Sequence, residues 1–357
     1  MLPYNVSRSD RRGALKPVSL ESYREATYPD PYPNGWYCLA PSEDVARGKT
    51  IAATALGQRF VIFRSDRDGT VGVLDAHCPH LGANLADGKV ENGNLTCPFH
   101  SWTFGRSGKV CSIPYATHVP SGLRAKAAEV RELDGQIFVW SGSHGRAAGA
   151  PPAYVIPEVP AIADGRMVYR GRHDAGTVRM HLCEFAENSA DFQHFAPLHG
   201  KLRLPWTAWN VPGFGIQHHA TWRPDPDATH IAYFDDDAML TFRGRDLPKS
   251  AAHATITFVG PGSLVRFEFQ LPGLGNIVMY QTHTPIAPLE LRVRFRWFAD
   301  RNIPRALVSY VIGNWVAQWG ADISIWENKV YVAKPMVIPE DGPIHELRRW
   351  FRQFYAA

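Results

Sequence analysis

The sequence predicts an α+β protein of two unequal domains: a small antiparallel β-domain, then a larger domain built on one large antiparallel sheet with helices. Over residues 35–140, short β-patterned runs such as RFVIF and VGVLDA alternate with turns, and Asp134-Gly135 is typical of a hairpin turn. Residues 141–160 are rich in Gly, Ala and Pro, which indicates a linker. Beyond them, strand patterns such as LVRFEFQ and LRVRFRWFA recur.

The same patterns predict an N-terminal arm, two domains and three helical segments. Residues 1–34 are polar and contain several prolines, so we expect an N-terminal arm. The small domain is assigned to residues 35–145 and the larger one to residues 160–357. Two helical segments, 184–198 and 304–328, interrupt the strands of the larger domain, and a third, HELRRWFRQFY, closes the chain.

Composition narrows the class of protein. The 357 residues are 45% hydrophobic, which is enough for two cores. The net charge is only +4 and no run of Lys or Arg occurs, so nucleic-acid binding is not expected. No stretch approaches the ~18 apolar residues of a membrane span, and the start lacks the apolar core of a signal peptide. We therefore expect a soluble, cytoplasmic protein without a transmembrane span.

Two Cys-His pairs lie close together in the small domain, as CPH at 78–80 and CPFH at 97–100. This is the ligand set of a Rieske [2Fe–2S] centre, in which two cysteines hold one iron and two histidines hold the other. A structural Cys2His2 zinc site uses the same donors, but zinc modules usually pair cysteine with cysteine and histidine with histidine. The spacing therefore favours a Rieske cluster, and its predicted ligands are Cys78, His80, Cys97 and His100.

The three remaining cysteines are Cys38, Cys111 and Cys183. They show no paired spacing, which fits a reducing compartment. We expect them to be small buried side chains.

A second metal site is indicated by ENSADFQHFAPLH, which carries His194 and His199. Five residues is not a same-face spacing in a helix. Pro197 should break the helix and allow His199 to return beside His194. Two histidines with one carboxylate form the facial triad of non-haem Fe(II) oxygenases, which keeps positions open for O2.

Three carboxylates compete for the third position: Glu187, Asp191 and Asp322. Asp322 is favoured because a helix through 315–326 would place it on one face with three tryptophans. An ionised carboxylate there is costly unless it is paired, and a metal or a core arginine would pair it. Glu187 is the reserve ligand. Asp191, one turn before the first histidine, is better placed to hydrogen-bond that ligand's free nitrogen.

These motifs resemble the Rieske non-haem iron oxygenases, in their terminal, substrate-binding component. CPHLGANLADGKV, CPFHSWTF and ENSADFQHFAPLHG are similar to the cholesterol 7-desaturases of the Neverland group. DISIWENK and EDGPIHELRRWFRQFY are similar both to that group and to bacterial 3-ketosteroid 9α-hydroxylases. The resemblance implies a Rieske domain followed by a helix-grip (START-like) catalytic domain, assembled as a homotrimer in which one subunit's cluster faces the next subunit's iron.

Site residues follow from the same resemblance. It implies that Asp191 bridges His100 of a neighbouring subunit to His194, and that Asn188 lies near the iron. The implied cluster ligands are Cys78, His80, Cys97 and His100, and the implied iron ligands are His194, His199 and Asp322.

The resemblance also implies partners and chemistry. Electrons come from NAD(P)H through a separate flavin/iron–sulfur reductase or a ferredoxin, since this chain has no GxGxxG fingerprint of its own. With O2, the expected reaction is desaturation or hydroxylation of an unactivated C–H bond in an apolar sterol or steroid. Aromatic residues such as Phe192, Phe195, Trp206 and Trp209 suit a flat apolar substrate.

Other functions remain open from the sequence alone. A cholesterol 7-desaturase-like reaction is the first hypothesis. The alternatives are a 3-ketosteroid 9α-hydroxylase-like monooxygenase, a sterol demethylating oxygenase, a ring oxygenase acting on a non-steroid aromatic, and an electron-transfer Rieske protein whose second domain only binds a partner.

Overall fold

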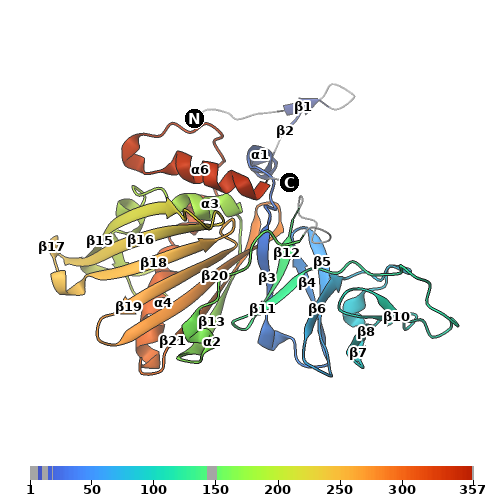
Figure 1. Ribbon diagram of the computed structural model, residues 1–357. Coiled ribbons are helices and arrows are strands. Elements are labelled where there is room, and N and C mark those ends of the chain that lie inside the picture. The colour runs from blue at the N-terminus through green and yellow to red at the C-terminus, as the bar shows by residue number, and fades with distance from the viewer. Residues whose placement is uncertain (1–6, 10–14, 18, 143–150, 356–357) are drawn as a thin grey trace.

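The computed structural model describes residues 7–9, 15–17, 19–142 and 151–355. Figure 1 shows short sheets in the N-terminal part at the right and one large sheet in the C-terminal part at the left. Residues 143–150 of the predicted linker at 141–160, which include the boundary near 145, lie outside the described residues.

Short antiparallel strands form the N-terminal part, as the alternating pattern predicted. They pair into the sheets β11-β12-β3, β4-β5-β6 and β10-β9-β8-β7. Asp134 and Gly135 both have positive φ, 50° and 71°, as a two-residue hairpin turn requires. The strands are β3 (Gly35–Pro41), β4 (Thr50–Ala55), β5 (Gln58–Arg64), β6 (Val71–Asp75), β7 (Lys89–Glu91), β8 (Asn94–Thr96), β9 (Thr103–Phe104), β10 (Val110–Ser112), β11 (Val130–Leu133) and β12 (Gln136–Ser141).

A nine-stranded antiparallel sheet dominates the C-terminal part, which confirms the predicted large sheet. Its order is β13-β21-β20-β19-β18-β16-β15-β14, with β17 paired to β16, so the first strand lies beside the last. The strands are β13 (Met167–Val178), β14 (Lys201–Arg203), β15 (Asn210–Pro224), β16 (Ile231–Phe242), β17 (Arg245–Asp246), β18 (Ala252–Val259), β19 (Leu264–Leu271), β20 (Gly275–Ala287) and β21 (Glu290–Asp300).

One helix, α4 (Arg305–Trp319), packs across a face of this sheet and gives it the expected helix-grip form. The Trp315 ring lies 4.4 Å from that of Phe267, and the Trp319 ring 5.3 Å from that of Phe295. The other helices are α1 (Leu20–Thr27), α2 (Pro160–Ala163), α3 (Leu182–Asn188), α5 (Ile323–Trp326) and α6 (Ile344–Arg352). No helix of the described residues is long and apolar enough to cross a membrane.

The helix expected over 184–198 is broken, which corrects the prediction. α3 ends at Asn188, and the chain forms a separate π-helical turn over Phe195–His199. The break occurs because the intervening residues bond to the C-terminal segment, where the Phe192 amide donates to the Asp341 oxygen at 2.9 Å.

The helix expected over 304–328 is also broken. α4 ends at Trp319 with Gly320 as its C-cap, and a new short helix, α5, starts after Asp322. Glycine is a poor helix former, so it is a natural place for the chain to change direction. The break puts Asp322 at a junction of two helices instead of on one continuous face.

A third correction concerns the cysteines. Cys38 and Cys183 are buried as expected, whereas Cys111 is exposed in the middle of the short edge strand β10.

Candidate functional site

The two Cys-His loops have the same backbone construction. One joins β6 to β7 and the other joins β8 to β9. In the first, the Cys78 amide donates to the Ala83 oxygen at 2.8 Å; in the second, the Cys97 amide donates to the Trp102 oxygen at 2.8 Å. A residue with positive φ turns each loop, Gly82 in the first. Two equivalent turns therefore present their ligands side by side.

The four side chains divide into an inner and an outer pair. Cys78 and Cys97 are 3% and 2% exposed and belong to the domain core. His80 and His100 are half-buried, with ring centroids 4.7 Å apart. Burial, with a contribution from the neighbouring Cys97, raises the pKa of the Cys78 thiol, so a bound metal must provide the charge that makes a thiolate stable there. An inner thiol pair and an outer imidazole pair fit the two irons of a Rieske centre.

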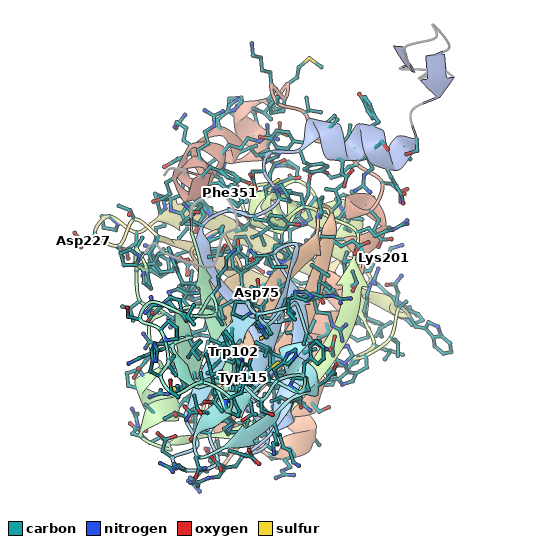
Figure 2. The ribbon with its side chains drawn as sticks, turned by 90° about the vertical axis from the view of Figure 1, so that its right-hand side faces the viewer. Asp75, Trp102, Tyr115, Lys201, Asp227 and Phe351 are labelled. Atoms are coloured by element: carbon teal, nitrogen blue, oxygen red, sulfur yellow. The ribbon has the colours of Figure 1, made fainter. Side chains whose placement is uncertain are left out.

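Trp102 contacts a predicted cluster ligand and was not identified from the sequence. Its ring stacks on His80 at 4.6 Å with an interplanar angle of 9°, and its Nε1 donates to the Tyr115 hydroxyl at 2.8 Å. Both aromatic residues lie together on the face of the molecule shown in Figure 2. Leu81 and Phe99 beside the histidines are more than half exposed, so the loops carry an exposed apolar surface.

The structure brings His194, His199 and Asp322 together. One donor atom from each lies within 4.8 Å of the others, and the His199 Nε2 lies 3.3 Å from Asp322 Oδ2. The imidazole rings are 5.1 Å apart and nearly perpendicular. The π-helical turn accounts for this, because it brings residues five apart onto one side.

The donor set fits a divalent iron with open coordination positions. Asp322 is 4% exposed and its Oδ1 has no partner within the described chain, and the same holds for Nδ1 of His199. His194 donates from Nδ1 to the backbone oxygen of Asp191 at 2.6 Å, which leaves Nε2 for a metal. Burial lowers the pKa of His194, which favours the neutral, metal-binding form.

The other site residues predicted from the sequence, Glu187, Asn188 and Asp191, are not among the three donors. Glu187 pairs with cations, its Oε2 lying 2.5 Å from Arg348 Nε, and it is not among the three donors. Asn188 accepts from Trp326 Nε1 at 3.3 Å and lines the cavity beside the histidines. For Asp191 the expectation needs correcting: its backbone oxygen, and not its carboxylate, holds the imidazole. The carboxylate is 4.0 Å from the same nitrogen.

A buried ion pair and a hydrogen bond connect the segments next to these ligands. Glu184 on α3 is 1% exposed and lies 2.5 Å from the Lys329 ammonium, three residues after α5. Arg24 on α1 donates to the Trp326 oxygen at 2.8 Å. The α3 side and the α5 side of the site are thereby held at a fixed separation.

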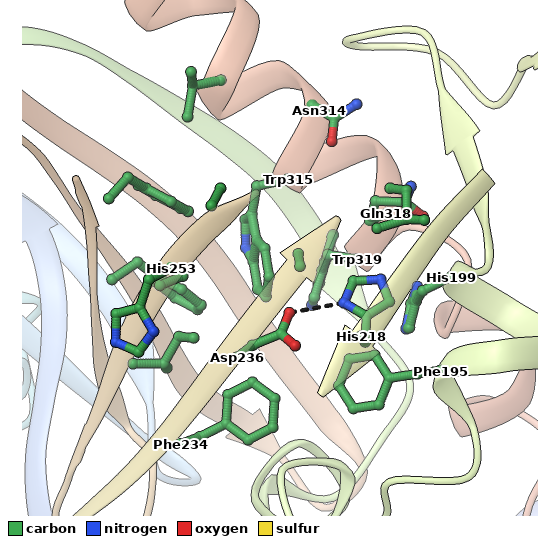
Figure 3. A pocket seen from close by; sticks show the side chains of 18 of the residues that line it. Phe195, His199, His218, Phe234, Asp236, His253, Asn314, Trp315, Gln318 and Trp319 are labelled. Atoms are coloured by element: carbon green, nitrogen blue, oxygen red, sulfur yellow. Dashed lines mark hydrogen bonds and ion pairs between the residues drawn. The ribbon is translucent and has the colours of Figure 1, made fainter. Parts of the chain in front are cut away.

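A cavity of about 340 Å³ opens beside the three donors, and Figure 3 shows it from close by with His199 at its wall. Apolar side chains from the sheet and from α4 make up most of its wall, including Leu202, Ile256, Phe258, Phe267 and Trp315.

The aromatic residues proposed from the sequence contribute little to this wall. Phe195 lines the cavity, whereas Phe192, Trp206 and Trp209 do not. The last two are 41% and 74% exposed.

Comparison with known proteins agrees with this geometry. The family model for the Rieske [2Fe-2S] domain matches residues 35–122, and the one for the 3-ketosteroid 9alpha-hydroxylase C-terminal domain matches residues 139–355. A cholesterol 7-desaturase of Xenopus laevis is 35% identical over 98% of this chain and 75% of its own. A probable 3-ketosteroid-9-alpha-monooxygenase, oxygenase component, of Rhodococcus rhodochrous is 31% identical over 92% of this chain and 81% of its own.

Solved structures show the same fold. Dicamba monooxygenase bound to dicamba superimposes with a TM-score of 0.64 at 22% identity, covering 90% of this chain and 97% of that one. NdmA of Pseudomonas putida with caffeine gives 0.66 at 16% identity, covering 90% and 93%. With both domain families matched in order, the chain belongs to the Rieske non-haem iron oxygenases, enzymes that combine a [2Fe–2S] cluster with a mononuclear iron and receive electrons from a separate reductase.

Proposed function

We propose that the chain is a terminal oxygenase that uses O2 to desaturate or hydroxylate a C–H bond of a sterol or steroid. The observation that carries the proposal is an apolar cavity that opens directly onto His194, His199 and Asp322. The names of its relatives, cholesterol 7-desaturase and 3-ketosteroid-9-alpha-monooxygenase, support a four-ring substrate.

Each metal group has its proposed residues. The cluster is held by Cys78, His80, Cys97 and His100, and the iron by His194, His199 and Asp322. When bound, the iron supplies activation of O2 with electrons delivered through the cluster. The protein holds His194 by its Nδ1 hydrogen bond and keeps the carboxylate of Asp322 out of water.

The cavity wall positions the substrate. Side chains such as Ile256, Phe258 and Phe267 offer no hydrogen bonds, so a rigid apolar skeleton binds by displacing water from them. Excluding water also protects the reacting centre from side reactions. Removing one hydrogen and adding a hydroxyl gives an alcohol, whereas removing two neighbouring hydrogens gives an alkene. The placement of the second C–H bond decides between the two outcomes.

We also propose a head-to-tail homotrimer in which electrons pass between subunits. Figure 1 shows the β7–β10 sheet, next to the cluster loops, on the opposite side of the molecule from β15 and β16 at the cavity. The Asp191 carboxylate is 36% exposed and 4.0 Å from His194 Nδ1, so it is accessible to a neighbour's His100. The exposed apolar surface at Leu81 and Phe99 supports docking there.

A 3-ketosteroid hydroxylase is the second candidate, favoured by the family match over residues 139–355. Turnover separates the candidates. The enzyme, loaded with both the cluster and the mononuclear iron, is incubated with a reductase, NADH and O2, and with cholesterol, a 3-ketosteroid or a non-steroid aromatic acid. Mass spectrometry should show a four-ring product that has lost two hydrogens or gained one oxygen. Oxidation of the aromatic acid alone would overturn the proposal.

A further inference from the structure

Two polar side chains stand inside the apolar cavity without belonging to the proposed iron site. His218 on β15 and Asp236 on β16 line the same cavity as the three donors, and His218 Nδ1 lies 2.7 Å from Asp236 Oδ2 (Figure 3). Their side chains are only 13% and 11% exposed. A buried polar pair in an apolar wall is costly unless it serves a ligand or the fold.

Strand geometry points both side chains inward. Along β15 and β16, alternate residues face the cavity. The cross-strand neighbours of Asp236 are Ala220 on one side and Ala254 on the other, and the neighbour of His218 is Ala238. Alanines around the pair leave space in front of it that larger side chains would fill.

The pair stands close to the reacting centre. The Phe195 ring lies 4.9 Å from the ring of His218 and 5.5 Å from the ring of His199. Both imidazoles therefore lie against the same phenyl ring. A substrate that fills the cavity beside the three donors therefore also faces His218.

The hydrogen bonds of the pair are incomplete. An ionised carboxylate only accepts, so the His218 nitrogen facing Asp236 carries the hydrogen. In the neutral imidazole the other nitrogen, Nε2, is then an acceptor. Within the part of the chain that the structure describes, Nε2 has no partner. A buried acceptor without a donor is unfavourable, and a ligand hydroxyl supplies a donor to it.

We propose that His218, oriented by Asp236, accepts a hydrogen bond from a hydroxyl group of the substrate. The cavity then selects a hydroxysterol over the corresponding ketosteroid, because a ketone has acceptors only and cannot donate to Nε2. This inference rests on the proposed function and narrows its substrate class. It assigns His218 a role in binding and Asp236 a role in positioning.

The test compares two ligands that differ only at one oxygen, 5α-cholestan-3β-ol and 5α-cholestan-3-one. Their dissociation constants are measured by equilibrium dialysis against the metal-loaded enzyme without reductase. Wild type should bind the alcohol about tenfold more tightly, the value of one well-made hydrogen bond in a buried site. In His218→Phe the ratio should fall to about one, chiefly through weaker binding of the alcohol.

Two further variants complete the design. His219→Phe makes the same substitution on the exposed face of β15 and should keep the wild-type ratio. In Asp236→Asn the amide can donate to Nδ1 of His218, so the imidazole hydrogen is no longer held on Nδ1 and can move to Nε2. The preference for the alcohol over the ketone should then fall, although the imidazole is still present. A wild type that prefers the ketone, or a ratio unchanged in both cavity variants, would overturn the inference and leave the proposed function standing. A wild type that binds neither ligand would overturn both.

Discussion

Replacing Asp322 with alanine removes the only carboxylate among the three donors of the proposed iron site. Two imidazoles remain, and neither carries a negative charge to offset the positive charge of the metal. We expect Asp322→Ala to hold about one iron fewer per chain and to lose turnover. The cluster absorption should stay unchanged, because Asp322 lies at the start of α5 in the C-terminal domain, whereas the cluster loops lie in the N-terminal domain.

Because bound iron stabilises the folded state, the loss of the site can be measured as a change in Tm. A ligand present at a hundred times its Kd stabilises the folded state by about 2.7 kcal/mol. For domains of this size, 1 kcal/mol shifts Tm by about 2–4 °C. Anaerobic Fe(II), added to protein depleted of its mononuclear iron, should therefore raise the wild-type Tm by about 5–10 °C. In Asp322→Ala the shift should vanish.

Glu187→Ala is the matched control, since the sequence alone leaves Glu187 as a competing ligand. Its carboxylate pairs with Arg348 in a largely buried contact, 16% and 11% exposed, and breaking it should cost about 3 kcal/mol. The variant should therefore have a lower starting Tm but keep the full iron-induced shift. A shift that survives in Asp322→Ala and disappears in Glu187→Ala would refute the ligand assignment.

Three other predictions concern pH, electron transfer and the cluster. Burial lowers the pKa of His181 and of His283 to about 4, below the value near 6.5 expected in the unfolded chain. The unfolded state therefore binds more protons, so stability is complete above about pH 6.5 and falls toward pH 4, by about 2 kcal/mol per histidine at pH 5. Urea unfolding should show this fall in the free energy of unfolding. Between pH 6.5 and pH 5, His283→Gln should lose about 2 kcal/mol less than wild type, and equal losses in the two proteins would contradict the prediction. Asp191→Asn should fill both metal sites but slow cluster reoxidation by orders of magnitude in rapid mixing with O2 and substrate, and wild-type rates would show that the carboxylate carries no electron route. His80→Cys should lower the cluster's reduction potential by several hundred millivolts in a redox titration, because histidine ligation raises it; an unchanged potential would exclude His80 as a ligand.

Residue spacing and strand alternation, which are local features of the sequence, made much of the fold and of the site predictable. The spacing of Cys78, His80, Cys97 and His100 specifies a donor set within two short loops, and strand alternation reveals the large sheet. The pairing of His194 with His199 was also predictable, because Pro197 excludes a regular helix between them.

Tertiary contacts decided what the sequence could not show. The ion pair of Glu187 with Arg348 joins residues 161 apart, and no local pattern reveals it. Asp322 was favoured through one continuous helical face, yet the chain breaks at Gly320 and brings Asp322 to the site from a junction. His218 and Asp236 meet only through the register of β15 with β16, which alternation alone does not fix.

We propose that one chain carries both a Rieske cluster and a mononuclear iron that oxidises a sterol or steroid. Metal analysis joined to a single turnover tests it most directly. The enzyme is reduced chemically, freed of reductant, and mixed with substrate and O2. We expect about three irons and two acid-labile sulfides per chain, with product formed as the cluster reoxidises. A colourless zinc protein, or two irons and reoxidation without product, would contradict it.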